Sequence, residues 1–223
     1  MTIPSCFLTG TDTEIGKTHA ACTLLHHWRQ AGLSAAGYKP VAAGGLFEAG
    51  ELINEDAARL LAASTPGPKL REINPVCLQA AIAPHIAAVE EGCSISLASL
   101  LEGYEALQEK HQRVVVEGVG GFRVPLGENF DTADLAQALG LPVVLVVGLR
   151  LGCLNHAILS AEAIAARRLR LFGWIANTLS PEMPRLKENF EALEKRLPAP
   201  CLGLLPWGLP PIEAARLLQA RSD

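Results

Sequence analysis

The residues with the clearest chemical potential lie in the segment FLTGTDTEIGKTHA, residues 7–20, which contains Gly16-Lys17-Thr18. This triplet is typical of a loop between a strand and a helix, where main-chain N–H groups surround phosphate. Lysine then contacts the outer phosphates, and the threonine hydroxyl binds Mg²⁺. The usual loop has four residues between its glycines, whereas five separate Gly10 from Gly16. The pattern indicates a nucleotide loop of unusual length; the alternative is an ordinary turn containing GKT by chance.

Three further charged residues stand where ligand-binding groups are expected. Glu117 ends the apolar run RVVVE. A carboxylate in this position is more typical of a metal or phosphate site than of a helix or loop cap. Lys39 follows a short apolar run, where it either stabilises transferring phosphoryl charge or is a solvated edge lysine. Asp56 falls in the first turn of a helix capped by Asn54, where a metal role and a helix-dipole role are equally open.

The sequence alternates between continuous apolar runs, which indicate strands, and segments with helical spacing of apolar residues. These strands and helices must position the groups above. We predict strands at 3–9, 34–40, 113–118, 141–148, 169–177 and 201–207. Helices are predicted at 17–31, 54–63, 83–92, 96–111, 155–168, 184–197 and 211–220, with 65–80 irregular. This order predicts an α/β fold for residues 1–223, a single doubly wound domain whose mostly parallel sheet has helices on both faces. In such folds ligands bind at the carboxyl ends of the strands.

Composition narrows the function classes. The 223 residues are 49% hydrophobic and carry a net charge of −4, which disfavours disorder and a nucleic-acid surface. No apolar run has the length of a membrane helix, and no secretory signal is evident. The six cysteines form no CxxC pair, the histidines form no spaced ligand set, and no serine has a nucleophile-elbow setting. We therefore expect a cytoplasmic protein without a membrane or nucleic-acid partner.

With these pieces placed, the sequence strongly resembles the dethiobiotin synthetases, ATP-dependent enzymes of biotin synthesis with a P-loop NTPase-like fold. The resemblance runs in family order from residue 8 to residue 207, and the five-residue gap in the loop is itself a family trait. The segments that carry it are TGTDTEIGKT, AGYKPVAAG, NEDA, APHIAA, VVVEGVGGFRVPL, LPVVLVVGLRLGCLNHA, GWIAN and LGLLPW.

The resemblance implies that 7,8-diaminononanoate, CO₂ and ATP react with Mg²⁺ to give a cyclic urea, ADP and phosphate. It implies an ATP site of Glu14, Ile15, Gly16, Lys17, Thr18, His19, Asp56, Glu117, Gly118, Val119, Gly120, Asn177, Thr178, Pro206, Trp207 and Gly208. Within this set the implied metal ligands are Thr18, Asp56 and Glu117. The implied catalytic residues are Lys39, Lys17 and Thr13.

The resemblance also implies a homodimer, in which the LGCLNHA segment of one subunit holds the substrate carboxylate of the other. The implied substrate-binding residues are Thr13, Lys39, Ala43, Gly152, Cys153, Leu154 and Asn155. Ala43 departs from the usual Ser or Thr, so a hydroxyl contact to substrate is lost. Arg150 replaces a common lysine, which keeps the charge and changes its geometry.

Two related classes remain as alternatives. Amidating enzymes of cobalamin synthesis share this type of loop and fold, but they usually carry a glutamine-hydrolysing domain for which this chain is too short. Partitioning and septum-placement ATPases carry an extra lysine early in the loop, where this chain has Thr11-Asp12-Thr13. Both are therefore less favoured than the synthetase.

Overall fold

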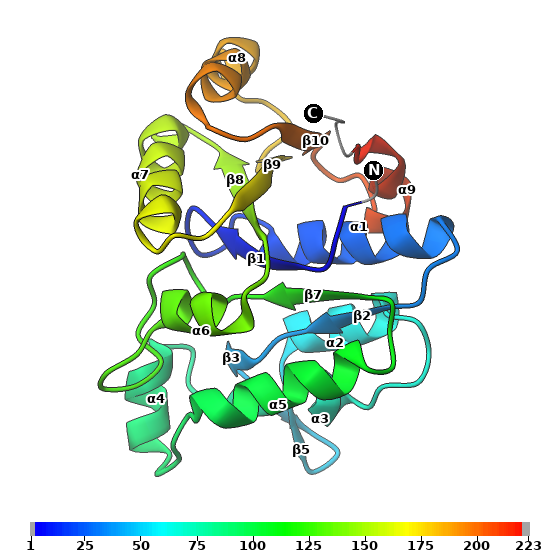
Figure 1. Ribbon diagram of the computed structural model, residues 1–223, viewed down its shortest axis with the longest axis vertical. Helices are drawn as coiled ribbons and strands as arrows, with labels where there is room; N and C mark the ends of the chain where they lie inside the picture. The colour runs from blue at the N-terminus through cyan, green and yellow to red at the C-terminus, as the bar shows by residue number, and fades with distance from the viewer. Residues whose placement is uncertain (1–2, 220–223) are drawn as a thin grey trace.

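The centre of the protein is a sheet of six parallel strands, seen in a computed structural model that describes residues 3–219 (Figure 1). The strand order is β10-β9-β8-β1-β7-β2. The strands are β1 (Cys6–Gly10), β2 (Ala35–Tyr38), β7 (Arg113–Glu117), β8 (Val143–Leu149), β9 (Leu171–Thr178) and β10 (Cys201–Leu205). All residues of β1, β2 and β8 are buried, because helices cover both faces and leave no solvent side for alternating polar residues.

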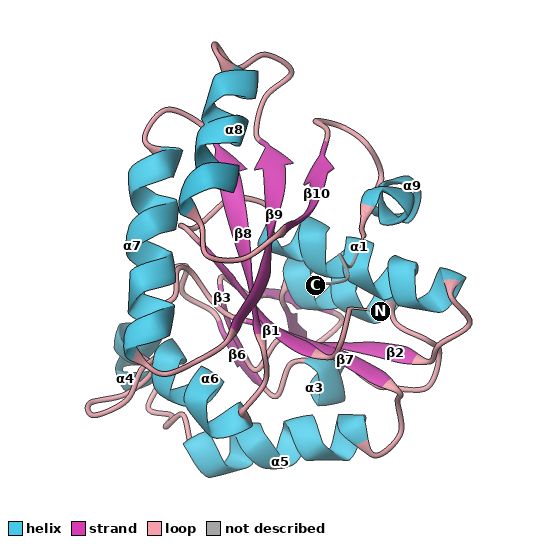
Figure 2. Cartoon of the chain, turned by 45° about the horizontal axis from the view of Figure 1, so that its top comes forward, coloured by secondary structure: helices cyan, strands magenta, loops and turns pink. Residues whose placement is uncertain are grey.

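The sheet lies between two helical layers (Figure 2). One layer holds α1 (Lys17–Gln30) and α9 (Pro211–Ala214), with α2 (Glu55–Ala63) packed on α1 and β2. The other layer holds α5 (Leu97–Gln108), α6 (Thr132–Leu139), α7 (Cys153–Ala166) and α8 (Leu186–Arg196). The predicted fold class is confirmed. No helix within residues 3–219 is long and apolar enough to span a membrane.

Short elements cluster beyond the end of β2. They are β3 (Val41–Ala43), β4 (Leu46–Glu48), β5 (Glu51–Ile53), α3 (Leu70–Ile73), β6 (Val76–Leu78) and α4 (Pro84–Glu90). The parallel pair β3–β6 and the antiparallel pair β4–β5 are separate from the central sheet. Among them, β3 and α4 carry residues of the large pocket described below, Ala43 and Pro84.

The structure corrects three sequence predictions. Residues 65–80 are not wholly irregular, because α3 and β6 lie there; the pairing of β6 with a distant strand leaves little local signal. Helix α6 was not predicted, although Asp131 caps it and Gly140 ends it in a left-handed conformation. The predicted helix 211–220 is α9 followed by a 3₁₀ turn at Ala215–Leu217, and Ala220 lies outside the described residues.

The burial of the cysteines predicts their reactivity. Cys6 on β1 and Cys22 on α1 are buried, and burial raises the pKa of each thiol to about 12. Cys93 is exposed. Because the thiolate is the reactive form, iodoacetamide at pH 8 should label Cys93 and spare Cys6 and Cys22 until denaturant is added. Peptide mass spectrometry measures this, and native labelling of Cys6 as fast as Cys93 would contradict the packing.

Candidate active site

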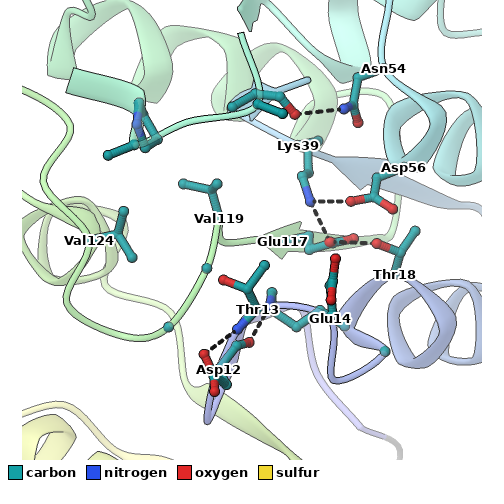
Figure 3. A pocket seen from close by; sticks show the side chains of 18 of the residues that line it. Asp12, Thr13, Glu14, Thr18, Lys39, Asn54, Asp56, Glu117, Val119 and Val124 are labelled. Carbon is teal, nitrogen blue, oxygen red and sulfur yellow. Dashed lines mark hydrogen bonds and ion pairs between the residues drawn. The ribbon is translucent and has the colours of Figure 1, made fainter. Parts of the chain in front are cut away.

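The groups predicted from the sequence meet at the carboxyl ends of β1, β2 and β7, around a pocket of about 860 Å³ (Figure 3). The loop after β1 forms one side, and the side chains of Lys39 and Glu117 reach it from the ends of β2 and β7. The predicted residues that line it are Thr13, Glu14, Gly16, Lys17, Thr18, His19, Lys39, Ala43, Asp56, Glu117, Val119 and Gly120.

A second pocket of about 420 Å³ opens beside the first. Its lining contains the predicted residues Asn177, Thr178, Pro206, Trp207 and Gly208, which follow β9 and β10. Both pockets share Glu14, Gly16 and His19. The phosphate-type loop therefore forms the boundary between two cavities, one rich in charged groups and one flanked by an indole ring.

The remaining predicted residues lie outside both pockets. Ile15 is fully buried under the loop, and the main-chain N–H of Gly118 donates to the carbonyl of Leu8. The segment from Gly152 to Asn155 forms the start of α7 and lines neither pocket of this chain. The structure thus brings most of the expected nucleotide residues together, and leaves Ile15, Gly118 and the expected carboxylate-binding segment outside the two pockets.

The loop after β1 depends on two left-handed residues and one amide. Glu14 has φ of 57° and Gly16 has φ of 84°, so the added residue of this loop is accommodated by a tight turn. The side-chain amide of Asn177 donates from Nδ2 to the carbonyl of Ile15 at 2.9 Å. A Cβ added to Gly16 would lie 2.1 Å from that same Nδ2. Asn177 therefore holds the loop from β9, and only glycine fits between them.

An ion-pair cluster lies at the base of the large pocket, with Lys39 and Glu117 buried and Asp56 partly exposed. Lys39 Nζ donates to Glu117 Oε1 at 2.6 Å and to Asp56 Oδ2 at 3.0 Å. Thr18 Oγ1 donates to the same Glu117 oxygen at 2.7 Å (Figure 3). Glu117 is fully buried and Lys39 is 4% exposed, so neither charge is solvated by bulk water. The cluster ties the first turn of α1 to the ends of β2 and β7.

Burial and partner charges set the protonation of these groups in different directions. Burial lowers the pKa of Lys17 to about 8, although Glu117 opposes that change. Burial would also lower the pKa of Lys39, but Glu117 and Asp56 outweigh it, and the pKa of Lys39 is raised. Burial would raise the pKa of Asp56, and the Lys39 ammonium reverses this, so that pKa is lowered. Lys39 and Asp56 are therefore fixed as a cation and an anion.

The same cluster has donor atoms suited to a hard cation. Among the described residues, no hydrogen-bond partner reaches Oε2 of Glu117, which is fully buried. Such an unpaired carboxylate oxygen is costly unless a cation or water completes it. Across residues 3–219 no three His, Cys, Asp or Glu side chains gather as a metal site. The oxygen set of Thr18, Asp56 and Glu117 fits Mg²⁺, which commonly takes few ligands from protein.

Several lining residues were missed by the sequence analysis. Arg59 lies one turn after Asp56 on α2, so the i,i+3 spacing was the signal that both share one helix face. Asn54, which caps α2, also lines the pocket and donates from Nδ2 to the carbonyl of Ala43 at 3.2 Å. Asp12 forms an ion pair with Arg150, which joins the loop to the segment before α7. Sequence alone had no local signal for that contact.

Two glycines with similar backbones make a matched test of the loop. Gly16→Ala meets left-handed strain of about 1–3 kcal/mol and a clash with Asn177. Nucleotide affinity should fall roughly tenfold or more, since about 1.4 kcal/mol is tenfold. Gly32 has a similar φ of +80°, but a Cβ added there would have no atom within 4 Å. Gly32→Ala should therefore lower stability and keep nucleotide affinity. Titration calorimetry and thermal unfolding measure both; equal affinities would refute the requirement for glycine at the loop.

Comparisons with known proteins identify the fold and the family. A family model described as an AAA domain matches residues 5–215. The MinC:MinD cell division protein complex of Aquifex aeolicus is similar in fold, with a TM-score of 0.57 and 13% identity over 99% of this chain and 97% of that one. A ParA family ATPase from Chlorobium tepidum has a TM-score of 0.53 and 13% identity over 92% and 85% of the two chains. At this identity the likeness concerns the fold alone.

Much higher similarity comes from curated proteins named ATP-dependent dethiobiotin synthetase. The relative from Aromatoleum aromaticum is 58% identical over 215 residues, 96% of each chain. The relative from Ralstonia nicotianae is 54% identical over 90% of this chain and 88% of its own. The relative from Xanthomonas campestris pv. campestris strain ATCC 33913 is 51% identical over 93% and 92%. With this identity across nearly the full length, the chain belongs to the ATP-dependent dethiobiotin synthetase family.

Proposed function

We propose that this protein closes the cyclic urea of dethiobiotin from 7,8-diaminononanoate, CO₂ and ATP, releasing ADP and phosphate. The observation that carries the proposal is the buried Lys39–Glu117 pair beside Thr18, at the base of a pocket large enough for a diamine chain. In a chain of this family, that arrangement puts fixed charge where phosphoryl transfer needs it.

The two pockets divide the substrates in this proposal. Adenine binds in the smaller pocket, where the half-exposed Trp207 offers an apolar surface and Asn177 and Thr178 offer polar groups. The phosphates cross the shared loop, within reach of its main-chain N–H groups and of Lys17. The diamine occupies the larger pocket beside Thr13 and Ala43. Its reacting amine then lies next to the outer phosphate.

The chemistry proceeds through a carbamate. One amine of the diamine takes up CO₂ and loses a proton, and a carbamate oxygen attacks the γ-phosphorus as ADP leaves. The second amine attacks the carbon of the mixed anhydride and loses a proton, the C–O bond to phosphate breaks, and the ring closes as phosphate leaves. Lys39 stays protonated because its pKa is raised, so its role is electrostatic stabilisation of carbamate and phosphate. Lys17, whose pKa lies near 8, gains its charge fully when phosphates approach.

Thr18, Asp56 and Glu117 would hold Mg²⁺ in this proposal. The support is their oxygen chemistry and the buried, unpaired Oε2 of Glu117 among the described residues. A bound Mg²⁺ neutralises charge on the nucleotide phosphates. Thr18 and Lys39 already share Oε1 of Glu117, which holds the carboxylate in one orientation. Asp56 contributes a second anion from the first turn of α2.

We also propose that residues 1–223 work as one domain in a cytoplasmic homodimer. The central sheet contains strands from the first, β1, to the last, β10, which supports one domain. An ATP-consuming reaction suits the cytoplasm. Asn155 and Leu151 are exposed near the start of α7, away from both pockets of their own chain. In a dimer, Gly152, Cys153, Leu154 and Asn155 would bind the substrate carboxylate of the partner subunit.

The reaction is tested directly with diamine, ATP and ¹³C-bicarbonate, with the labelled cyclic urea detected by mass spectrometry. Lys39→Gln removes the buried cation and should slow product formation by about 10²–10³-fold, while ATP affinity changes far less. Lys110→Gln serves as control, because Lys110 is an exposed partner of Glu72 and should keep full activity. No labelled urea from the wild-type protein would refute the function; a Lys39→Gln variant with wild-type turnover would refute only the role of Lys39.

Mixed dimers test whether the site is shared between subunits. Lys39→Gln and Asn155→Ala should each be nearly inactive alone, because each damages both sites of a symmetric dimer. After mixing and subunit exchange, about half of the dimers should be mixed with one intact site each, restoring roughly a quarter of wild-type activity. Size-exclusion chromatography with light scattering verifies the dimer. A mixture that remains as inactive as its components would overturn the shared site.

A further inference from the structure

The segment 118–131 forms one wall of the large pocket without belonging to a helix or strand. Val119, Gly120, Gly121 and Val124 in this segment line the pocket. Between β7 and α6 its backbone pairing consists of an isolated bridge from Pro125 to Asp131 and a turn closed on the carbonyl of Phe130. The position of the wall therefore depends on hydrogen bonds that neighbouring elements make to it.

Thr132, the first residue of α6, supplies two such bonds with its side chain. Its hydroxyl donates to the carbonyl of Phe122 at 2.7 Å and accepts from the main-chain N–H of Val124 at 2.9 Å. Its own N–H donates to the carbonyl of Val124 at 2.9 Å. Thr132 is 1% exposed, so water does not readily replace these bonds. The Thr132 side chain thus links Phe122 and Val124, the residues that flank Arg123, to the start of α6.

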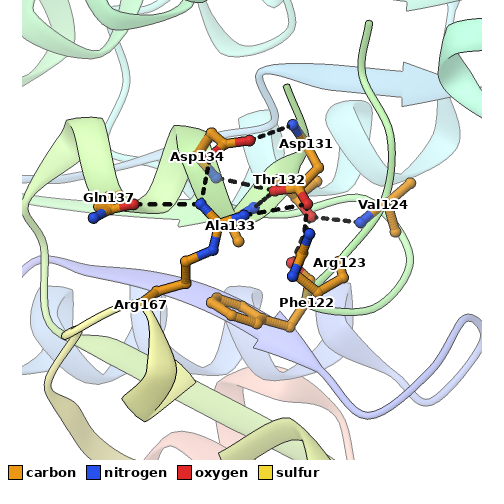
Figure 4. Close-up of polar contacts among 9 residues, drawn as sticks. All are labelled: Phe122, Arg123, Val124, Asp131, Thr132, Ala133, Asp134, Gln137 and Arg167. Carbon is orange, nitrogen blue, oxygen red and sulfur yellow. Dashed lines mark hydrogen bonds and ion pairs between the residues drawn. The ribbon is translucent and has the colours of Figure 1, made fainter. Parts of the chain in front are cut away.

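Charged side chains hold the start of α6 in turn (Figure 4). Asp131 Oδ1 accepts from the main-chain N–H groups of Ala133 and Asp134, and Asp134 Oδ2 accepts from the N–H of Asp131. Arg123 forms an ion pair with Asp131. Arg167, at the end of α7, contacts both Asp131 and Asp134. The start of α6, which carries Thr132, is therefore also held by α7.

A short path leads from Thr132 to the reacting part of the pocket. Thr132 holds both main-chain polar groups of Val124, whose side chain backs Gly120: an added Cβ there would lie 2.9 Å from Val124 Cγ2. The same Cβ would lie 3.6 Å from Thr13 Oγ1 across the pocket. Val124 and Gly121 belong to the large pocket and not to the smaller one. A shift of Val124 would change the diamine pocket and leave the smaller pocket intact.

We propose that Thr132 is a positioning residue for the diamine: its hydroxyl fixes the part of the 118–131 wall around Val124 at the distance from Thr13 that the reacting amine requires. Thr132 touches no substrate and acts through Val124. This inference rests on the proposed function of the pocket.

The experiment uses Thr132→Val, which keeps the side-chain shape and removes the hydroxyl. We expect kcat/KM for the diamine to fall on the order of tenfold to a hundredfold, as for a displacement of about 1 Å in a positioned site. The dissociation constant of ATP, measured separately by calorimetry, should change much less than the diamine kcat/KM, because Thr132 bonds to Phe122 and Val124 and not to Val119 or Gly120, the two wall residues expected in the ATP site. Thr132→Ser keeps the hydroxyl and should restore most of the diamine kcat/KM.

Thr65→Val is the matched control. The Thr65 hydroxyl accepts from the N–H of Ala35 at 2.9 Å, at the start of β2 and away from the carboxyl ends that form the pocket. The same substitution there should lower the midpoint of thermal unfolding and leave the diamine kcat/KM unchanged.

The outcomes separate the two proposals. A wild-type protein that makes no cyclic urea contradicts the proposed function itself. A wild-type protein that makes it, with Thr132→Val lowering only the unfolding midpoint as Thr65→Val does, overturns the role of Thr132. An unrestored Thr132→Ser variant, or an equal loss of ATP affinity, also overturns it. If Thr132→Val fails to fold, the test uses Thr132→Ser together with Arg167→Gln, which removes the ion pairs that hold the start of α6 from α7. A folded Arg167→Gln variant with full diamine kcat/KM then contradicts the role of Thr132.

Discussion

The buried bond between Lys39 and Glu117 is the constraint on which the rest of the site depends. Glu117 ends a strand of valines and has no exposed surface, so its charge is tolerable only with close partners. Lys39 provides one and Thr18 another, and each comes from a different element. Removal of one partner from such a pair commonly costs about 3–5 kcal/mol. The site is therefore also a junction that fixes α1, β2 and β7 relative to one another.

Around this junction the walls of the pocket are held by side chains from distant parts of the chain. Asn177 binds the carbonyl of Ile15 from β9, and Thr132 binds the residues on both sides of Arg123 from α6. Both wall segments are loops, whose backbone polar groups have few partners of their own. A rigid parallel sheet thus presents the charged groups, while single polar side chains set the distances between loops. This arrangement suits chemistry in which two amines and a phosphate must be oriented together.

Most of the central fold was predictable because its signals are local. Continuous runs of valine and leucine indicated buried parallel strands, and the cap residue Asn54 marked the start of α2. The missed elements have weaker local signals. Strand β6 is three residues long and exists through its pairing with β3, and α6 follows an irregular segment that obscured its capping residue Asp131. Strand β6 and helix α6 were therefore not predicted from the sequence.

By itself, the sequence determined the fold class, the family and the phosphate-type loop, because strand periodicity and the spacing of GTDTEIGKT are written in consecutive residues. Only the tertiary structure decided which polar groups touch. It joined Lys39 to Glu117, placed Arg59 in the pocket, and left Asn155 outside both pockets of its own chain. It also showed that glycine at 16 is required by the approach of Asn177. Such contacts join residues far apart in the chain, and their distances follow from the packing of the whole sheet.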